Sequence, residues 1–97
     1  MTITHHSNNQ FQLPNTLTYK NAMNAVKAGR QAIDLESQAQ ISFNLSHLEI
    51  VDSSAIAVLI DWKKYCNKKS NKTIVFTGVS EQLKNLAMVY GVYELLF

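Results

Sequence analysis

The segment of the sequence best suited to chemistry is a short polar one, Asp52, Ser53 and Ser54. It directly precedes the run 55–60, which is apolar throughout. An acidic or hydroxyl residue before such a run is typical of a helix N-terminus, where its oxygen accepts a hydrogen bond from a free backbone N–H. Because the positive end of the helix dipole favours negative charge, a serine here could also carry a phosphate. The segment therefore suits the binding of a partner protein that phosphorylation could switch.

Catalysis on this chain is the weaker hypothesis. A nucleophilic triad would need His47 and Asp52 arranged around one of the two serines, but Asp52 precedes them directly and is better placed as a helix cap. The glycines of a nucleophile elbow are missing around Ser53 and Ser54. The pair His5-His6 has no third metal ligand nearby in the sequence, and no glycine-rich phosphate-binding loop occurs. We therefore expect a chain that is not an enzyme, with no metal and no cofactor.

Length and composition indicate one small globular domain over residues 1–97, in which residues 1–9 form either a flexible start or the first strand of a hairpin. The chain has 97 residues, of which 46% are hydrophobic, and a net charge of +2, too small to favour nucleic acid as a partner. Cys66 is the only cysteine, so no internal disulfide is expected and a reducing compartment is favoured. No apolar run approaches the roughly 18 residues of a membrane span, and the start lacks a signal-peptide core. These features favour the cytoplasm.

Hydrophobic periodicity predicts the elements that must position the polar segment. The predicted order is a hairpin over 2–6 and 10–13, a helix over about 19–35 capped by Thr18, a strand over 41–46, a helix over about 53–68, a strand over 73–77, and a helix from Ser80 that stops at Gly91, before a tail that packs back as a short strand or turn. Alternating strands and helices imply an α/β fold with a mixed, mostly parallel four-stranded sheet and about three helices.

The helix after the polar segment is apolar on more than one face. Its core stripe consists of Ala55, Val58, Leu59, Trp62 and Cys66. In the last predicted helix, Tyr90 is likewise predicted to lie in the core. The remaining apolar residues fall partly outside this stripe; they are Ile56, Ala57 and Ile60. Either the sheet buries both flanks of the helix or part of this surface contacts another protein. In the preceding helix, small residues such as Gly29 would allow close packing against a sheet.

These residues carry a resemblance to a known family. The stretch Val51 to Leu59 resembles the helix start of STAS domains, where Val-Asp-Thr/Ser and two small residues precede an apolar helix. Within that family it is most similar to the small cytoplasmic STAS subunit (MlaB-like) of Mla phospholipid ABC transporters. The Gly78-Val79 turn and the stretch from Leu86 to Tyr90 extend the resemblance, which covers roughly 41–90. Ala55 departs from the family pattern, which most often has glycine there.

The resemblance implies a non-catalytic accessory subunit in a bacterium. It would bind the cytoplasmic ATPase of a phospholipid-transporting ABC complex of the Mla type, which maintains outer-membrane lipid asymmetry, and would support its assembly and activity. Such a subunit would be peripherally associated with the inner membrane through the complex. The implied partner-binding residues are Asp52, Ser53, Ser54, Ile56, Ala57 and Ile60.

An alternative stays open at this point. The Asp-Ser-Ser form of the motif is also that of anti-sigma-factor antagonists, whose second serine is phosphorylated by a partner serine kinase. Carried over by position, Ser54 is the candidate phosphoacceptor. Ser53 matches the threonine that engages the partner in the transporter subunits, and is the second candidate for phosphorylation.

Overall fold

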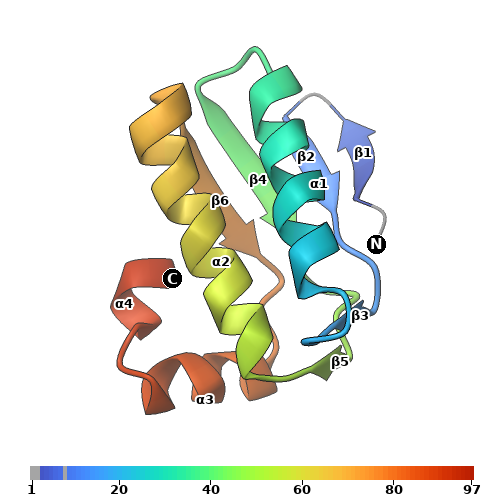
Figure 1. The fold of residues 1–97 in the computed structure, drawn as a ribbon, viewed down its shortest axis with the longest axis vertical. Coiled ribbons are helices and arrows are strands. Elements are labelled where there is room, and N and C mark those ends of the chain that lie inside the picture. The colour runs from blue at the N-terminus through green and yellow to red at the C-terminus, as the bar shows by residue number, and fades with distance from the viewer. Residues whose placement is uncertain (1–2, 8) are drawn as a thin grey trace.

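A four-stranded mixed sheet with two helices in front of it forms the body of the chain (Figure 1). The computed structural model describes residues 3–7 and 9–97. The strands follow the order β1-β2-β4-β6, with β1 antiparallel to β2 and the other neighbours parallel. Their bounds are β1 Thr4–Ser7, β2 Gln10–Gln12, β4 Gln40–Asn44 and β6 Thr73–Thr77. The predicted mostly parallel sheet is confirmed, and so is the hairpin within the described residues; Thr2, where it was predicted to begin, lies outside them.

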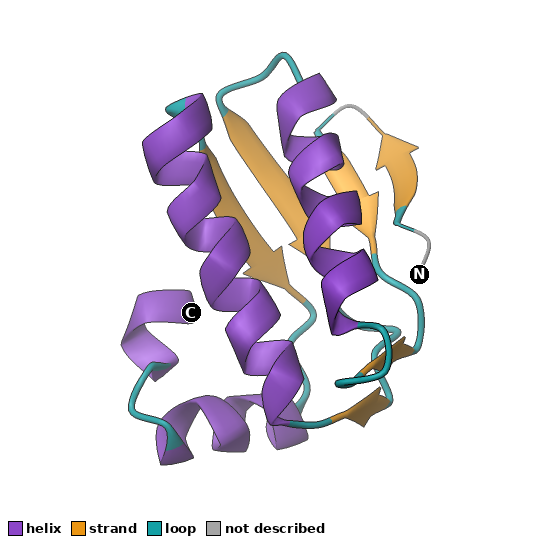
Figure 2. Cartoon of the chain, viewed as in Figure 1, coloured by secondary structure: helices purple, strands orange, loops and turns teal. Residues whose placement is uncertain are grey.

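The helices and a second small sheet complete the fold (Figure 2). The helical elements are α1 Ala22–Leu35, α2 Ser53–Tyr65, a π-helical continuation η1 Cys66–Ser70, α3 Glu81–Val89 and α4 Tyr93–Leu96. Helices α1 and α2 lie side by side over the sheet, α3 crosses below the start of α2, and α4 lies beside α2 (Figure 1). Two short parallel strands, β3 Thr16–Leu17 and β5 Ile50–Val51, pair next to the starts of α1 and α2.

Alternation along the central strands decides which face the helices cover. Ile41 and Phe43 of β4 and Ile74 and Phe76 of β6 are buried, whereas the residues between them are half-buried or exposed. Because successive side chains of a strand point to opposite faces, the apolar set lies under the helices and the other face of these strands is mostly polar. The apolar face provides most of the core.

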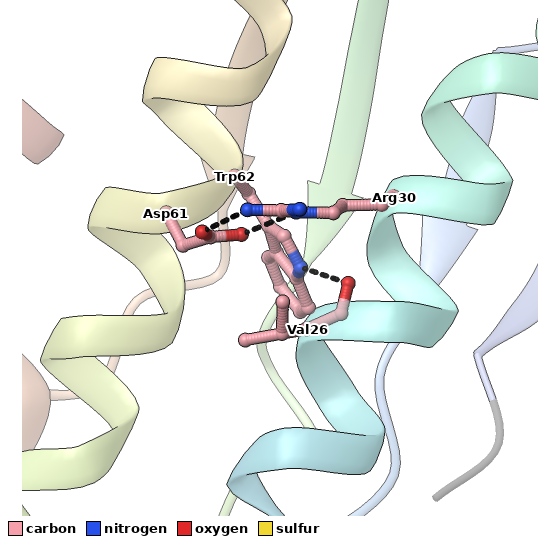
Figure 3. Close-up of polar contacts among 4 residues, drawn as sticks. All are labelled: Val26, Arg30, Asp61 and Trp62. Atoms are coloured by element: carbon pink, nitrogen blue, oxygen red, sulfur yellow. Dashed lines mark hydrogen bonds and ion pairs between the residues drawn. The ribbon is translucent and has the colours of Figure 1, made fainter.

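The two long helices are held together by a glycine–tryptophan contact. Trp62 of α2 is fully buried, and its Nε1 lies 3.4 Å from the carbonyl oxygen of Val26 in α1 (Figure 3). A Cβ added to Gly29 would lie 2.1 Å from the indole ring, so only glycine leaves room for it. The close packing expected at Gly29 is therefore made with α2. Above it, Arg30 forms a bidentate ion pair with Asp61, with distances of 2.6 and 3.1 Å (Figure 3).

Helix α1 begins later than its sequence predicts. Thr18 does not cap it, because the helix starts at Ala22 after Asn21. The Asn21 side chain instead fastens the preceding loop: its Oδ1 accepts a hydrogen bond from the Thr18 N–H and its Nδ2 donates to the carbonyl of Thr16, both at 2.9 Å. Residues 19–21 form a turn instead of helix.

Two further predictions are wrong near the C-terminus. The tail forms α4, a short helix, instead of a strand or turn. Tyr90 is 55% exposed and lies outside the core, because α3 ends at Val89 and the helical stripe no longer applies to the next residue.

The second long helix, α2, ends earlier than predicted, at Tyr65, and the chain continues as the π-helix η1.

Candidate functional site

The carboxylate of Asp52 joins two segments at the start of α2. Its Oδ1 accepts a hydrogen bond from the Ser54 N–H at 2.8 Å, which is the predicted helix cap. Its Oδ2 accepts a second bond, from the Tyr19 N–H at 3.1 Å, in the turn before α1. Both carboxylate oxygens are thus used within the chain. Asp52 therefore links the start of α2 to the turn before α1.

The two serines differ in how far they reach solvent. Ser53 is exposed and Ser54 is half-buried, while Ala55 behind them is fully buried. The family pattern most often has glycine at position 55, which has no side chain to pack in the core. The methyl group of Ala55 is buried there instead. The hydroxyl of Ser53 is the polar group that the helix start presents outward.

The apolar residues of this helix start do not all reach the surface. Ala57 is exposed and Ile60 is half-buried, as expected of residues outside the core stripe. Ile56, predicted to lie partly outside the stripe, is only 4% exposed and belongs to the core. Its burial follows from α2 being covered on two sides, by the sheet and by α3 with α4.

An open apolar groove of about 330 Å³ lies beside Ser53, between α2 and the turn that joins α3 to α4. It is lined by Ser53, Ile56, Ala57, Ile60, Tyr90 and Val92. Gly91 makes this turn possible, because its φ of +71° lies in the left-handed region that glycine favours. The Val92 N–H donates to the Ala87 carbonyl at 2.9 Å, which fixes the two groove residues of the turn. Four predicted residues, Ser53, Ile56, Ala57 and Ile60, therefore line one groove with two that the sequence did not assign to the site, Tyr90 and Val92.

A second group of exposed apolar side chains lies on the other side of the cap. Tyr19, Met23 and Ile50 are 71%, 72% and 57% exposed. Tyr19 is tied to Asp52 by its N–H, and Ile50 lies on β5, two residues before Asp52. Periodicity did not indicate Tyr19 or Ile50, because the turn and the two-residue strand that carry them are too short to show a pattern. Met23 lies in the first turn of α1.

The other candidate chemistry finds no assembled site in the described part of the chain. His47 is exposed, and none of the described hydrogen bonds joins it to Ser53 or Ser54. Among the side chains that are described, no three His, Cys, Asp or Glu residues gather as metal ligands; the side chain of His6 lies outside that set. Burial raises the pKa of the Cys66 thiol to about 11, which suppresses its reactive thiolate form. Within residues 3–7 and 9–97, every helix is too short or too polar to cross a bilayer.

Comparison with known proteins agrees with the predicted architecture. A family model described as "Mlab, STAS domain" matches residues 5–96. The structure of the anti-sigma factor antagonist SpoIIAA in its unphosphorylated form superposes with a TM-score of 0.71, covering 96% of this chain and 82% of that chain at 13% sequence identity. At so low an identity the likeness shows a shared fold. No match is found among curated proteins.

Proposed function

The chain belongs to the MlaB-like group of the STAS domain family, and from this membership we propose that it is a non-catalytic subunit that binds the cytoplasmic ATPase of an Mla-type, phospholipid-transporting ABC complex. In this role it supports the assembly and activity of the complex. It lies in the cytoplasm and associates with the inner membrane only through the other subunits. STAS domains bind partner proteins, and the described part of this chain presents a surface suited to that task.

One observation carries the proposal: an exposed serine hydroxyl at a helix start borders an open apolar groove. Ser53 supplies the hydroxyl, and Ala57, Ile60, Tyr90 and Val92 supply most of the groove. Burial of such a groove against a partner removes apolar area from water, while the hydroxyl at its edge fixes orientation through a hydrogen bond. Ser53, Ala57 and Ile60 belong to α2, and the turn that carries Tyr90 and Val92 is held by backbone hydrogen bonds to α3, so little ordering is needed on binding.

The test is the affinity of the purified chain for the transporter ATPase encoded beside it, measured by biolayer interferometry. Ala57→Glu places a charge in the groove and Ser53→Glu replaces the exposed hydroxyl with a larger, charged group. Each is expected to weaken binding by about tenfold or more, as for a central interface residue. Leu35→Glu is the control, because Leu35 is 86% exposed at the far end of α1. Unchanged binding by both site variants would contradict the proposal.

The alternative is a regulator of the anti-sigma-factor antagonist type, switched by phosphorylation of Ser54. It draws support from the fold shared with SpoIIAA and from the position of Ser54 at the start of α2, one residue after the exposed Ser53. A phosphate there would add about −1.5 to −2 charge close to the Asp52 carboxylate. Mass spectrometry after incubation with the serine kinase encoded nearby decides this, since a chain without phosphate on Ser54 or Ser53 would exclude it. A neighbouring permease and ATPase would favour the transporter role instead.

A further inference from the structure

Large exposed apolar side chains gather at one end of the described molecule. Eight of them are more than half exposed, and only Leu35, at the far end of α1, lies away from the others. The remaining seven belong to the turn before α1 and its first turn, to β5, and to α3 and α4 with the residue after α3, all in the lower part of Figure 1. They are Tyr19, Met23, Ile50, Met88, Val89, Tyr90 and Leu95. Single exposed apolar residues are ordinary on a protein surface, but such a concentration marks an interaction surface.

This end of the molecule extends well beyond the groove. We call residues 15–23, 46–60 and 78–97 the docking end. The cap of α2 lies in its middle, with the groove on one side and Tyr19, Met23 and Ile50 on the other. The hydrogen bonds that Asp52 accepts from Ser54 and Tyr19 connect the two sides. A partner can therefore meet both sides as one preformed surface.

Charge is distributed unequally between the docking end and the rest of the chain. The docking end holds two lysines and four carboxylates, a net charge of −2, whereas the rest of the chain holds seven Lys or Arg and three carboxylates, a net charge of +4. Two carboxylates of the docking end, those of Glu49 and Glu94, are exposed and form no ion pair with the described residues. Glu49 is next to Ile50 and Glu94 is next to Leu95, so each stands beside an exposed apolar residue at a different edge of the surface.

We propose that the ATPase covers the whole docking end, with a patch that is apolar at its centre and bears Lys or Arg at its rim. This inference rests on the proposed function and specifies the surface of the partner. The apolar centre matches the seven exposed side chains, and the basic rim matches Glu49 and Glu94. The lysine-rich remainder of the chain would be repelled by such a rim, which fixes the orientation of docking.

Two variants of α1 test the extent of the surface. Met23→Asp and Leu35→Asp place the same charge on the same helix, at side chains that are 72% and 86% exposed. Met23 lies in the docking end and Leu35 outside it. We expect Met23→Asp to weaken binding of the ATPase by about tenfold and Leu35→Asp by less than about twofold. Because both side chains are exposed, neither variant should lower the melting temperature appreciably.

Two double variants test the charge of the rim. Glu49→Gln/Glu94→Gln removes two negative charges from the docking end, and Lys64→Gln/Lys68→Gln removes two positive charges from exposed positions outside it. The glutamate variant should bind about threefold more weakly at 50 mM salt and lose less affinity than the wild type when salt rises to about 500 mM. The lysine variant should bind at least as well as the wild type.

The outcomes separate this inference from the function on which it rests. If Ala57→Glu abolishes binding while Met23→Asp and the glutamate variant bind like the wild type, the partner meets the groove alone and the inference is overturned. If the wild-type chain does not bind the ATPase at all, both the proposed function and the inference are overturned. Loss of affinity in Met23→Asp and in the glutamate variant, with normal binding by Leu35→Asp and the lysine variant, supports it.

Discussion

At the scale of single residues, Asp52 connects two segments of the chain beside the candidate site. One carboxylate oxygen caps α2 and the other holds the turn before α1. A residue that sequence analysis assigned to partner binding thus also has a structural role, and its substitution would disturb the interface indirectly. Loss of binding on substitution of Asp52 is therefore weaker support for direct contact than the same loss on substitution of Ala57.

Asp52→Ala should lower the free energy of unfolding by about 1–3.5 kcal/mol. The lost helix cap accounts for about 0.5–2 kcal/mol and the lost bond to the Tyr19 N–H for about 0.5–1.5 kcal/mol. Urea denaturation followed by circular dichroism measures the change. Ser53→Ala, next to it and exposed, should change stability by less than about 0.5 kcal/mol. Asp52→Asn should fall between the two, because asparagine caps helices nearly as well. Equal stability of the alanine variants at 52 and 53 would contradict this account.

Cys66 makes the folded chain less stable at alkaline pH. Burial raises the pKa of its thiol from an ordinary value of 9.0 to about 11 in the folded chain. Between these values the unfolded chain has lost the proton that the folded chain still holds, so rising pH favours unfolding. We expect the free energy of unfolding to fall from pH 9 to 11 by at most about 3 kcal/mol.

Urea titrations at a series of pH values test this, with Cys66→Ala as the matched variant. The substitution should flatten the fall in stability without removing it entirely, because the hydrogen bond to Asp34 also raises the pKa of Tyr65. A thiol reagent at pH 8 should label wild-type Cys66 slowly when folded and rapidly in urea. Fast labelling of the folded chain would show that the thiol is not sealed.

At the scale of elements, sequence periodicity predicted the long segments and the hairpin but missed the two-residue strands and the short helix α4. The segment of β4 alternates apolar and polar residues, β6 contains a short apolar run, and α1, α2 and α3 show helical stripes, so their presence and type could be read directly. Strands β3 and β5 have two residues each, too few for any alternation. The start of α1 was missed because Thr18 resembles a cap, whereas Asn21 fastens the loop around it.

The candidate site could be predicted only as far as it is local in sequence. The cap and the apolar helix start are neighbours along the chain, so Asp52, Ser53 and Ala57 were identified together. Tyr90 and Val92 come to the same groove from more than 30 positions away, and no local pattern indicates that. Met88 and Val89, the two apolar residues directly before Tyr90, are exposed as well.

The contact between α1 and α2 depends on the absence of a side chain at Gly29. Gly29→Ala would gain about 1 kcal/mol of helix propensity, but the added Cβ would meet the Trp62 ring at 2.1 Å. Overpacking of this kind costs about 1–3 kcal/mol, and the contact is too short for a small rotation to relieve. We therefore expect a net loss of stability in urea denaturation.

A double-mutant cycle shows whether the tryptophan is the cause. Trp62→Phe has a smaller ring and should tolerate alanine at position 29 better than the wild type does. The double variant Gly29→Ala/Trp62→Phe should accordingly be more stable than the sum of the two single changes predicts. Strict additivity would mean that another group limits the approach of the helices.

At the scale of the whole molecule, α2 connects two ends of different character. Its first turns lie in the docking end, with an excess of carboxylates and exposed apolar side chains, and its last turn and η1 lie among lysines. Lys72 uses its charge within the chain: its Nζ donates to the carbonyls of Ile33 and Glu36 at the C-terminal end of α1, where a cation is favoured. Lys72 thus stabilises the end of α1 that lies away from the docking end.

Amide hydrogen exchange should reveal how cooperative the sheet is. Strand β4 is paired on both sides, with β2 and β6, and its apolar residues lie in the core, so its amides should exchange only through global unfolding. Strand β1 pairs with β2 alone, through a register shift between His5 and Ser7, and its amides should exchange through local opening about 100-fold faster. Exchange measured by NMR at residues 4–7 and 40–44 tests this. Equal protection of the two strands would mean that β1 unfolds only with the core, and the hairpin would then be a full part of the cooperative unit.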